Sequence, residues 1–419
     1  MQNKMTNLPQ GWEVKKLEEI ANIKGGKRLP KGENLLDNNT KFAYIRVADF
    51  QDNGTINLQN IKFINENTYN VLKNYKIYDD NLYISIAGTI GKSGIIPKEL
   101  NGAILTENAV KLEYIQNNIS NKFMYFFTLS NIFKTQIQTS TKIVAQPKLA
   151  ITRLKQIQIP LPPLKEQERI VGILDESFAK IDESIKILEQ NLLNLDELMQ
   201  SALQKAFNPL KDNAKENYKL PQGWEWKNLG EICFITDGTH KTPNYIEKGV
   251  PFLSVKNISK GFFDLSDVKY ISLEEHNKLI KRAKPEFGDI LICRIGTLGK
   301  AIKISLDFEF SIFVSLGLLK PKVKIISDYL VYFLNSYFIE GWINNNKVGG
   351  GTHTAKLNLN ILEKCPIALP SLKEQEQIAS YLDRLSLNIK DLKQNYQTQI
   401  KNLQELKKSL LDKAFKGNL

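Results

Sequence analysis

The sequence LPPLKEQE at residues 161–168 returns as LPSLKEQE at residues 369–376. In each copy proline disfavours helix just upstream, and two glutamates follow in what would be the first helical turn, where the helix dipole favours negative charge. Each copy therefore predicts the start of a helix, at matching places in two halves of the chain.

The apolar residues after each start step alternately by three and four, which is the spacing of a helix with one continuous apolar seam. The first seam is predicted to comprise Leu174, Phe178, Ile181, Ile185, Leu188, Leu192, Leu195, Met199 and Ala202. The second is predicted to comprise Leu382, Leu385, Ile389, Leu392, Tyr396, Leu403, Leu406 and Leu410, with Gln399 as one polar position. One such helix alone would be ordinary core packing, but two in one chain predict that the helices pair with each other.

The connection between the two helices predicts their relative direction. The second globular segment begins where the first helix ends and ends where the second helix begins, and the termini of a domain usually lie close together. The helices are therefore expected to run antiparallel. About 43 residues at ~1.5 Å each would make each helix ~65 Å long, a rigid spacer between two domains.

Three further blocks recur in the same order along the chain. LPQGWE at residues 8–13 returns at 220–225, GTIGK at 88–92 returns as GTLGK at 296–300, and KAF at 205–207 returns at 413–415. This order indicates duplication of a unit about half the chain long, arranged as a tandem of domains. Between the shared blocks the apolar alternation is kept while the polar residues change.

The segment ahead of each helix mixes short β-rich runs with Gly, Asn and Asp turn signals and a few helical stretches, which indicates an α+β domain. The predicted fold is thus two similar α+β domains separated by two long antiparallel coiled-coil helices, as a pseudo-twofold internal repeat. The predicted boundaries are domain 1 at residues 1–163, helix 1 at 164–208, domain 2 at 209–370 and helix 2 at 371–419.

The composition favours a polyanionic partner. Lys and Arg number 57 against 45 Asp and Glu, a formal net charge of +12, which suits nucleic acid. The three cysteines, Cys233, Cys293 and Cys365, form no CxxC pair. Neither a disulfide framework nor a thiolate zinc site is therefore expected. This cysteine usage predicts that the protein lies in a reducing cytoplasm. No run of ~18 apolar residues predicts a membrane span.

A basic, pseudo-twofold chain suits two short sites on duplex DNA about one helical turn of ~34 Å apart. Because the two domains differ between their shared blocks, the two half-sites should differ too. The candidate DNA contacts lie in or beside loops that flank β-rich runs, and a solvated surface charge is the alternative for each. These candidates are Arg46, Thr89, Lys92, Lys142, Lys148, Arg294, Thr297, Lys300, Lys347 and Lys356.

The repeated GTxGK block ends like a phosphate-binding P-loop, which requires a further glycine two positions earlier. Ile86 and Arg294 stand there, and the second copy has Ala301 in place of the metal-binding hydroxyl. We interpret the block as a tight turn whose amides and lysine either contact a DNA phosphate or remain solvated. Nucleotide binding, and hence an ATPase or nuclease, is the alternative.

With LPxGW opening each domain, GTxGK inside it and LPxLxEQE opening each helix, the chain resembles the specificity subunits of type I restriction-modification systems along essentially its whole length. The resemblance implies two target-recognition domains, an asymmetric bipartite DNA target methylated on adenine, and assembly with two methyltransferase subunits and with motor-nuclease restriction subunits. It also implies that this chain binds no cofactor, while its partners use S-adenosylmethionine, ATP and Mg²⁺.

No catalytic site is expected in this chain, because no Asn-Pro-Pro-Tyr motif or Gly-rich dinucleotide fingerprint occurs. No metal site is expected either, because the cysteines and histidines lack metal-ligand spacing. A coiled-coil scaffold that only gathers proteins is a further alternative. Trp12 and Trp224, present in both copies, are expected to anchor the cores. His240, His276 and His353 are expected on the surface or in turns, with His240 and His353 in loops that could read bases.

Overall fold

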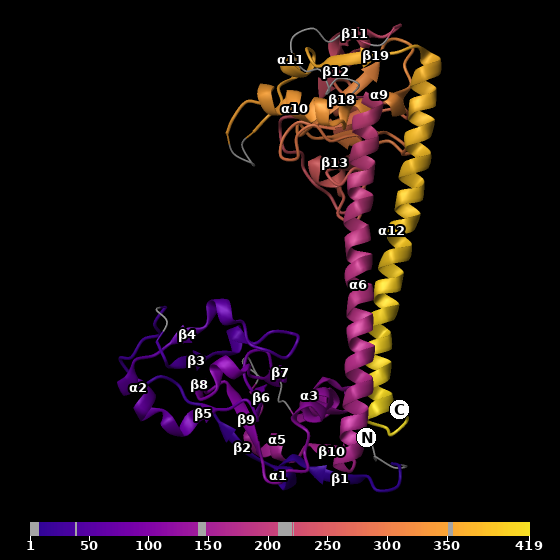
Figure 1. The fold of residues 1–419 in the computed structure, drawn as a ribbon. Helices are drawn as coiled ribbons and strands as arrows, with labels where there is room; N and C mark the ends of the chain where they lie inside the picture. Colours follow the sequence, from indigo (N-terminus) through magenta and orange to yellow (C-terminus); the bar gives the residue numbers. More distant parts are fainter. Residues whose placement is uncertain (1–7, 38–39, 141–147, 208–219, 221, 351–354) are drawn as a thin grey trace. The chain divides into compact units, whose positions relative to one another are not determined.

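The computed structural model describes residues 8–37, 40–140, 148–207, 220, 222–350 and 355–419. The chain divides into two compact units, Met1–Leu188 with Thr398–Leu419 and Glu189–Gln397. Each unit is built from a mixed α+β domain and from parts of two long helices (Figure 1). The predicted α+β class is therefore confirmed.

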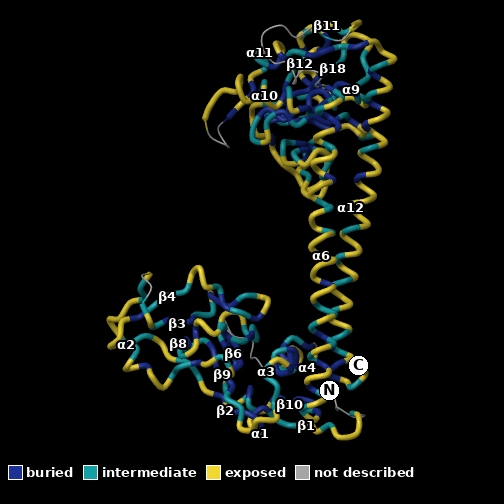
Figure 2. The backbone as a smooth tube through the Cα atoms, in the orientation of Figure 1, coloured by how far each residue is buried: buried dark blue, intermediate teal, exposed yellow. Residues whose placement is uncertain are grey.

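Two sheets form the domain of the first unit. The antiparallel sheet has the order β2 (Ala21–Gly25), β9 (Ala109–Tyr114), β6 (Leu82–Ser85) and β7 (Ser93–Ile95). The second sheet has the order β4 (Lys62–Phe63), β3 (Ala43–Ile45), β8 (Ala103–Leu105) and β5 (Lys76–Ile77), in which β3 and β8 are parallel. The strands are mostly buried because apolar residues line them (Figure 2).

A similar topology recurs in the second unit, without a described counterpart of β5. Its antiparallel sheet has the order β12 (Cys233–Asp237), β18 (Leu316–Pro321), β15 (Ile290–Cys293) and β16 (Ala301–Lys303). Its other sheet has the order β14 (Lys269–Ile271), β13 (Val250–Leu253) and β17 (Ser311–Ile312), with β13 and β17 parallel. The internal repeat in the sequence is therefore a repeat of topology.

Short helices complete both domains. The first unit holds α1 (Leu17–Ile20), α2 (Glu66–Val71), α3 (Asn121–Leu129), α4 (Asn131–Ser140) and α5 (Ile151–Lys155). The second holds α7 (Leu229–Ile232), α8 (Leu273–Leu279), α9 (Ser327–Leu334), α10 (Tyr337–Asn346) and α11 (Leu359–Leu362). Single 3-10 turns lie at Val47–Asp49, Leu58–Asn60, Lys73–Tyr75, Lys98–Leu100 and Val255–Asn257.

A two-stranded ribbon joins the start of each domain to its end. In the first unit β1 (Glu13–Lys16) pairs antiparallel with β10 (Gln158–Leu161), and in the second β11 (Glu225–Asn228) pairs in the same way with β19 (Pro366–Leu369). Trp12 and Trp224, just ahead of these ribbons, are partly buried against the domain cores. The expectation that both tryptophans anchor the cores is confirmed.

The long helices are α6 (Leu164–Phe207) and α12 (Leu372–Ala414), and each begins inside its repeated LPxLxEQE block. The glutamine of that block is buried in both copies. Gln167 donates to Pro162 O at 2.9 Å and accepts from Ser120 N at 2.9 Å. Gln375 donates to Pro370 O at 2.9 Å and accepts from Ile326 N at 3.0 Å. The repeated glutamine thus fastens each helix start to its domain.

The two long helices pack together and run antiparallel. In the first unit Lys407 of α12 forms an ion pair with Asp182 of α6, and in the second unit Lys393 forms one with Asp196. Asp196 lies further along α6 than Asp182, whereas its partner Lys393 lies earlier on α12 than Lys407, by the same number of residues. The predicted antiparallel pair is therefore present.

Burial separates the predicted seam positions into three groups. Leu174, Ile181, Leu195, Ala202, Leu382 and Ile389 are buried. Phe178, Ile185, Leu188, Leu192, Met199, Leu385, Tyr396, Leu403 and Leu410 are half-buried. Leu392 and Leu406 are 41% and 46% exposed, and Gln399 is exposed as well, so these three positions differ from expectation.

The difference arises because the step after Ile389 on α12 is four residues, where the sequence pattern suggests three. The half-buried positions that follow at this spacing are Lys393, Tyr396, Ile400, Leu403, Lys407 and Leu410. The polar members of this face are therefore the two lysines that pair with α6, in place of Gln399. Lys407 also lies over the ring of Phe178, with Nζ 4.8 Å from the ring centre.

Candidate nucleic-acid interface

The repeated GTxGK block forms a tight hairpin turn in both units. In the second unit Gly299 N donates to Cys293 O and Cys293 N donates to Lys300 O, each at 2.8 Å, which closes the turn between β15 and β16. Gly296 and Gly299 have φ of 82° and 81°, a backbone that side chains rarely adopt. A P-loop would lead into a helix, but this turn leads into a strand.

The first unit repeats this geometry between β6 and β7. Gly91 N donates to Ser85 O at 2.9 Å, and Ser85 N donates to Lys92 O at 2.8 Å. The turn exposes Thr89 in this unit, as it exposes Thr297 in the other. Lys92 is half-buried and forms an ion pair with Asp52 at 2.8 Å. The tight turn expected from the sequence is thus present twice.

An exposed lysine lies beside each turn at an equivalent place. Lys148 forms an isolated antiparallel bridge with Ala87, and Lys356 forms the same bridge with Ile295. These two loops differ in sequence, yet the backbone pairs in the same way in both units. Lys142 and His353 lie outside the described residues.

In the second unit the turn borders a pocket of about 470 Å³. Its lining includes three of the predicted DNA contacts, Thr297, Lys300 and Lys347, and one carboxylate, Glu340. Lys356 is close by, because it bridges both Ile295 before the turn and Val348. The fold therefore gathers the cationic candidates of this unit around one concave surface, which suits contact with phosphates.

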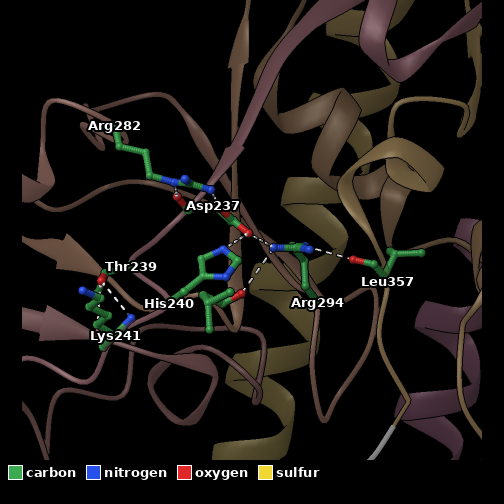
Figure 3. Close-up of polar contacts among 8 residues, drawn as sticks. Asp237, Thr239, His240, Lys241, Arg282, Arg294 and Leu357 are labelled. Atoms are coloured by element: carbon green, nitrogen blue, oxygen red, sulfur yellow. Dashed lines mark hydrogen bonds and ion pairs between the residues drawn. The ribbon is translucent and has the colours of Figure 1, made fainter.

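Arg294 has a different place from the one predicted. Its side chain is only 9% exposed and forms an ion pair with the buried carboxylate of Asp237 (Figure 3). Its Nε also donates to Leu357 O at 2.9 Å. Arg294 therefore supports the turn and the segment of Lys356 and Leu357 from within the domain, and a DNA contact from this side chain stays a prediction.

Asp237 is the centre of this polar cluster. It accepts hydrogen bonds from Arg294 and Arg282, and His240 Nε2 lies 3.1 Å from its Oδ2. Burial raises the pKa of Asp237, but the two arginines outweigh that effect and hold the pKa below its ordinary value. The carboxylate is therefore charged at neutral pH, as a buried acid with paired cations should be.

Arg46 of the first unit is also a supporting residue. Its Nε donates to Asp49 Oδ2 at 3.1 Å and its Nη2 donates to Asp49 Oδ1 at 2.6 Å and to Asn60 O at 2.9 Å. Asp49 is buried. The arginine thus braces the turn after β3 through its Nε and Nη2 groups.

Sequence reasoning missed the residues that hold these surfaces together. Asp237 occupies the position of Gly25 in the first copy, as Arg294 occupies that of Ile86, so the buried ion pair is present in one copy and absent from the other. That paired difference was a usable signal. His276, expected on the surface or in a turn, is buried, with Nδ1 2.9 Å from Ser311 Oγ.

The three cysteines are buried, and the part of the chain that the structure describes contains no cluster of metal ligands. Cys233, Cys293 and Cys365 are free and buried, and burial raises the pKa of each thiol to about 12. Within the described residues no group of three or more His, Cys, Asp or Glu could hold a metal ion. No described helix is both long and apolar enough to cross a membrane.

Residues 9–193 and 221–402 each match the family model described as Type I restriction modification DNA specificity domain. The chain belongs to this family. The two matched segments each contain one recognition domain with its hairpin turn and part of a long helix, so the family repeat coincides with the structural repeat.

The chain is similar to known specificity subunits along nearly its full length. The EcoBI specificity subunit of Escherichia coli is 25% identical, with 100% of this chain and 88% of that protein covered. The EcoKI specificity subunit of Escherichia coli strain K12 is 24% identical, with 98% and 90% covered. The MjaVIII specificity subunit of Methanocaldococcus jannaschii is 25% identical, with 98% and 94% covered.

Solved structures share the fold. A chain from a structure on complex assembly and conformational transition of the type I R-M system has a TM-score of 0.78 at 22% identity, covering 99% of this chain and 100% of that one. The HsdS subunit from Thermoanaerobacter tengcongensis has a TM-score of 0.62 at 21% identity, with 100% of both chains covered.

Proposed function

We propose that this chain is the sequence-specific DNA-binding specificity subunit of a type I restriction-modification complex and that it reads an asymmetric bipartite target. The main support is a surface feature that both domains share. Each of two family domains presents the same hairpin turn and adjacent lysine on the same backbone frame, while the side chains around them differ. A shared frame suits a common DNA backbone, and differing side chains suit two different half-sites.

The partners follow from the family and from the long helices. We propose that two methyltransferase subunits and the restriction subunits bind this chain in the cytoplasm. Large apolar residues of α6 and α12 that do not pack in the seam are exposed, among them Ile187, Leu193 and Leu387. Exposed apolar surface on a helix favours contact with another protein.

We propose further that the chain is not itself an enzyme. Its partners would supply the chemistry, using S-adenosylmethionine for methyl transfer and ATP with Mg²⁺ for restriction. The GTxGK turn supports this view, because it connects two strands and lacks the helix that a P-loop uses to hold phosphates. The buried cysteines, with their raised pKa values, are not suited to act as nucleophiles.

The decisive experiment is methylome sequencing of cells that express this chain with its methyltransferase subunit. We expect adenine methylation within one bipartite motif with unlike halves. Cells with the methyltransferase subunit alone are the control and should show no such motif. Methylation that is independent of this chain, or a motif without two separate halves, would contradict the proposal.

Binding of purified complex to DNA across a salt series separates DNA recognition from a scaffold role. Neutralisation of DNA phosphates releases counterions, so affinity for DNA should fall steeply as ionic strength rises. Weak binding that does not depend on salt would favour a scaffold. Turnover of ATP by the purified chain, lost in Lys92→Ala, would favour an enzyme.

A further inference from the structure

Arg282 of the second unit is an exposed arginine held in one orientation by a buried acid (Figure 3). Its side chain is 55% exposed, whereas that of Asp237 is 2% exposed. Nε of Arg282 donates to the carbonyl oxygen of Asp237 at 3.2 Å, and Nη2 donates to its carboxylate. Asp237 is in turn fixed by Arg294 from inside the domain.

These contacts use one edge of the guanidinium group. Nε and one Nη2 hydrogen are directed at Asp237, which leaves Nη1 and the second Nη2 hydrogen for another partner. Among the residues that the structure describes, none accepts a hydrogen bond from Nη1 of Arg282. Two parallel N–H groups at the end of a guanidinium match O6 and N7 of guanine in the major groove.

The orientation matters because arginine has many rotamers. An unrestrained arginine loses this freedom on binding, whereas Arg282 is already ordered by Asp237 in the free protein. A guanidinium group with a set direction can match one base edge, and the same edge can also bind two phosphate oxygens. The fixed direction matters most for base reading, because only a base contact distinguishes one sequence from another, whereas phosphates occur at every step of the duplex.

The position of this cluster connects it to the candidate interface. Arg294 immediately precedes the hairpin turn, and Leu357, whose carbonyl it binds, immediately follows Lys356. Asp237 thus ties Arg282 to the two segments that carry the other cationic candidates of this unit. In the first unit Gly25 and Ile86 replace Asp237 and Arg294, so no such buttress forms there.

We propose that Arg282 reads a guanine in the half-site bound by the second domain, with Asp237 and Arg294 as its positioning residues. This inference rests on the proposed function, because it assigns a specific base contact to one of the two recognition domains. It requires a G·C pair in one half of the target and attributes the choice of that pair to a single side chain.

The test uses Arg282→Ala in the full chain, expressed with its methyltransferase subunit and read by methylome sequencing. Lys281→Ala is the matched control, because it removes the same charge from an exposed neighbour. We expect Arg282→Ala to reduce discrimination for guanine at one position by roughly 5- to 150-fold. The other half-site should keep its sequence, and Lys281→Ala should leave the whole motif unchanged.

Three results would overturn the inference alone. They are a motif left intact by Arg282→Ala, a uniform loss of methylation at every sequence as for a phosphate contact, and a wild-type motif whose relevant half contains no G·C pair. A wild-type chain that directs no bipartite methylation would overturn the proposed function as well. Retention of the other half-site in Arg282→Ala shows that the variant is folded and assembled.

Discussion

In the first unit Gly25 ends strand β2 and Ile86 precedes the hairpin turn, whereas the second unit places Asp237 and Arg294 at these positions and joins them by a buried ion pair. The turn, the glycines and the neighbouring lysine are the same in both units. The two recognition domains therefore differ in buried residues as well as in exposed ones. A buried pair of charges can orient an exposed side chain above it.

Replacement of a whole domain is the strongest way to test this comparison. If residues 1–160 are exchanged for the equivalent domain of another family member, one half-site should change completely and the other should remain. Each domain carries its own core, so neither depends on the other for its reading surface. Methylome sequencing would show the result, and a simultaneous change of both halves would refute two independent readers.

Breaking the buried ion pair should have the next largest effect. Arg294→Ala leaves Asp237 buried with one partner fewer, and loss of one member of a buried pair costs about 3–5 kcal/mol. Urea unfolding would measure this loss. The double variant Asp237→Gly with Arg294→Ile, which copies the first unit, should recover much of the stability and still lose discrimination for the guanine that Arg282 reads.

The two seam lysines allow a smaller comparison between the units. Lys407 has both Asp182 and the ring of Phe178, so Lys407→Gln should cost about 1 kcal/mol of unfolding free energy. Lys393 pairs with Asp196, and no described aromatic ring lies under its ammonium group, so Lys393→Gln should cost about 0.5 kcal/mol. Equal losses in urea unfolding would show that the ring contributes nothing.

Acidification should affect the second unit through Asp237. Because its folded pKa is depressed, this carboxylate contributes stability above its ordinary pKa of about 3.9 and loses that contribution as pH falls toward the folded value. Unfolding measured from pH 7 to pH 3 should therefore have a shallower acid limb in the Asp237→Gly, Arg294→Ile double variant. An unchanged limb would mean that Asp237 does not contribute to acid sensitivity.

The sequence alone established the duplication, the starts of both long helices and most of their shared seam. These features are visible because they depend on comparison of the chain with itself and on short-range periodicity. LPxLxEQE marks a helix start wherever it occurs, and a spacing of three and four residues places side chains on one helical face in any context. The tight GTxGK turn was predictable for the same reason, since two glycines set its backbone locally.

Which charged residues become supports depends on long-range contacts that appear only in the folded chain. Arg294 and Arg46 resemble surface cations in the sequence, and they become supports because folding brings Asp237 and Asp49 against them. Likewise α12 presents Lys393 and Lys407 to α6 and leaves Leu392 and Leu406 exposed. One step of four residues in place of three rotates the face of the helix that its partner covers. A residue is buried when other residues cover it, and in these cases the covering residues are distant in the sequence.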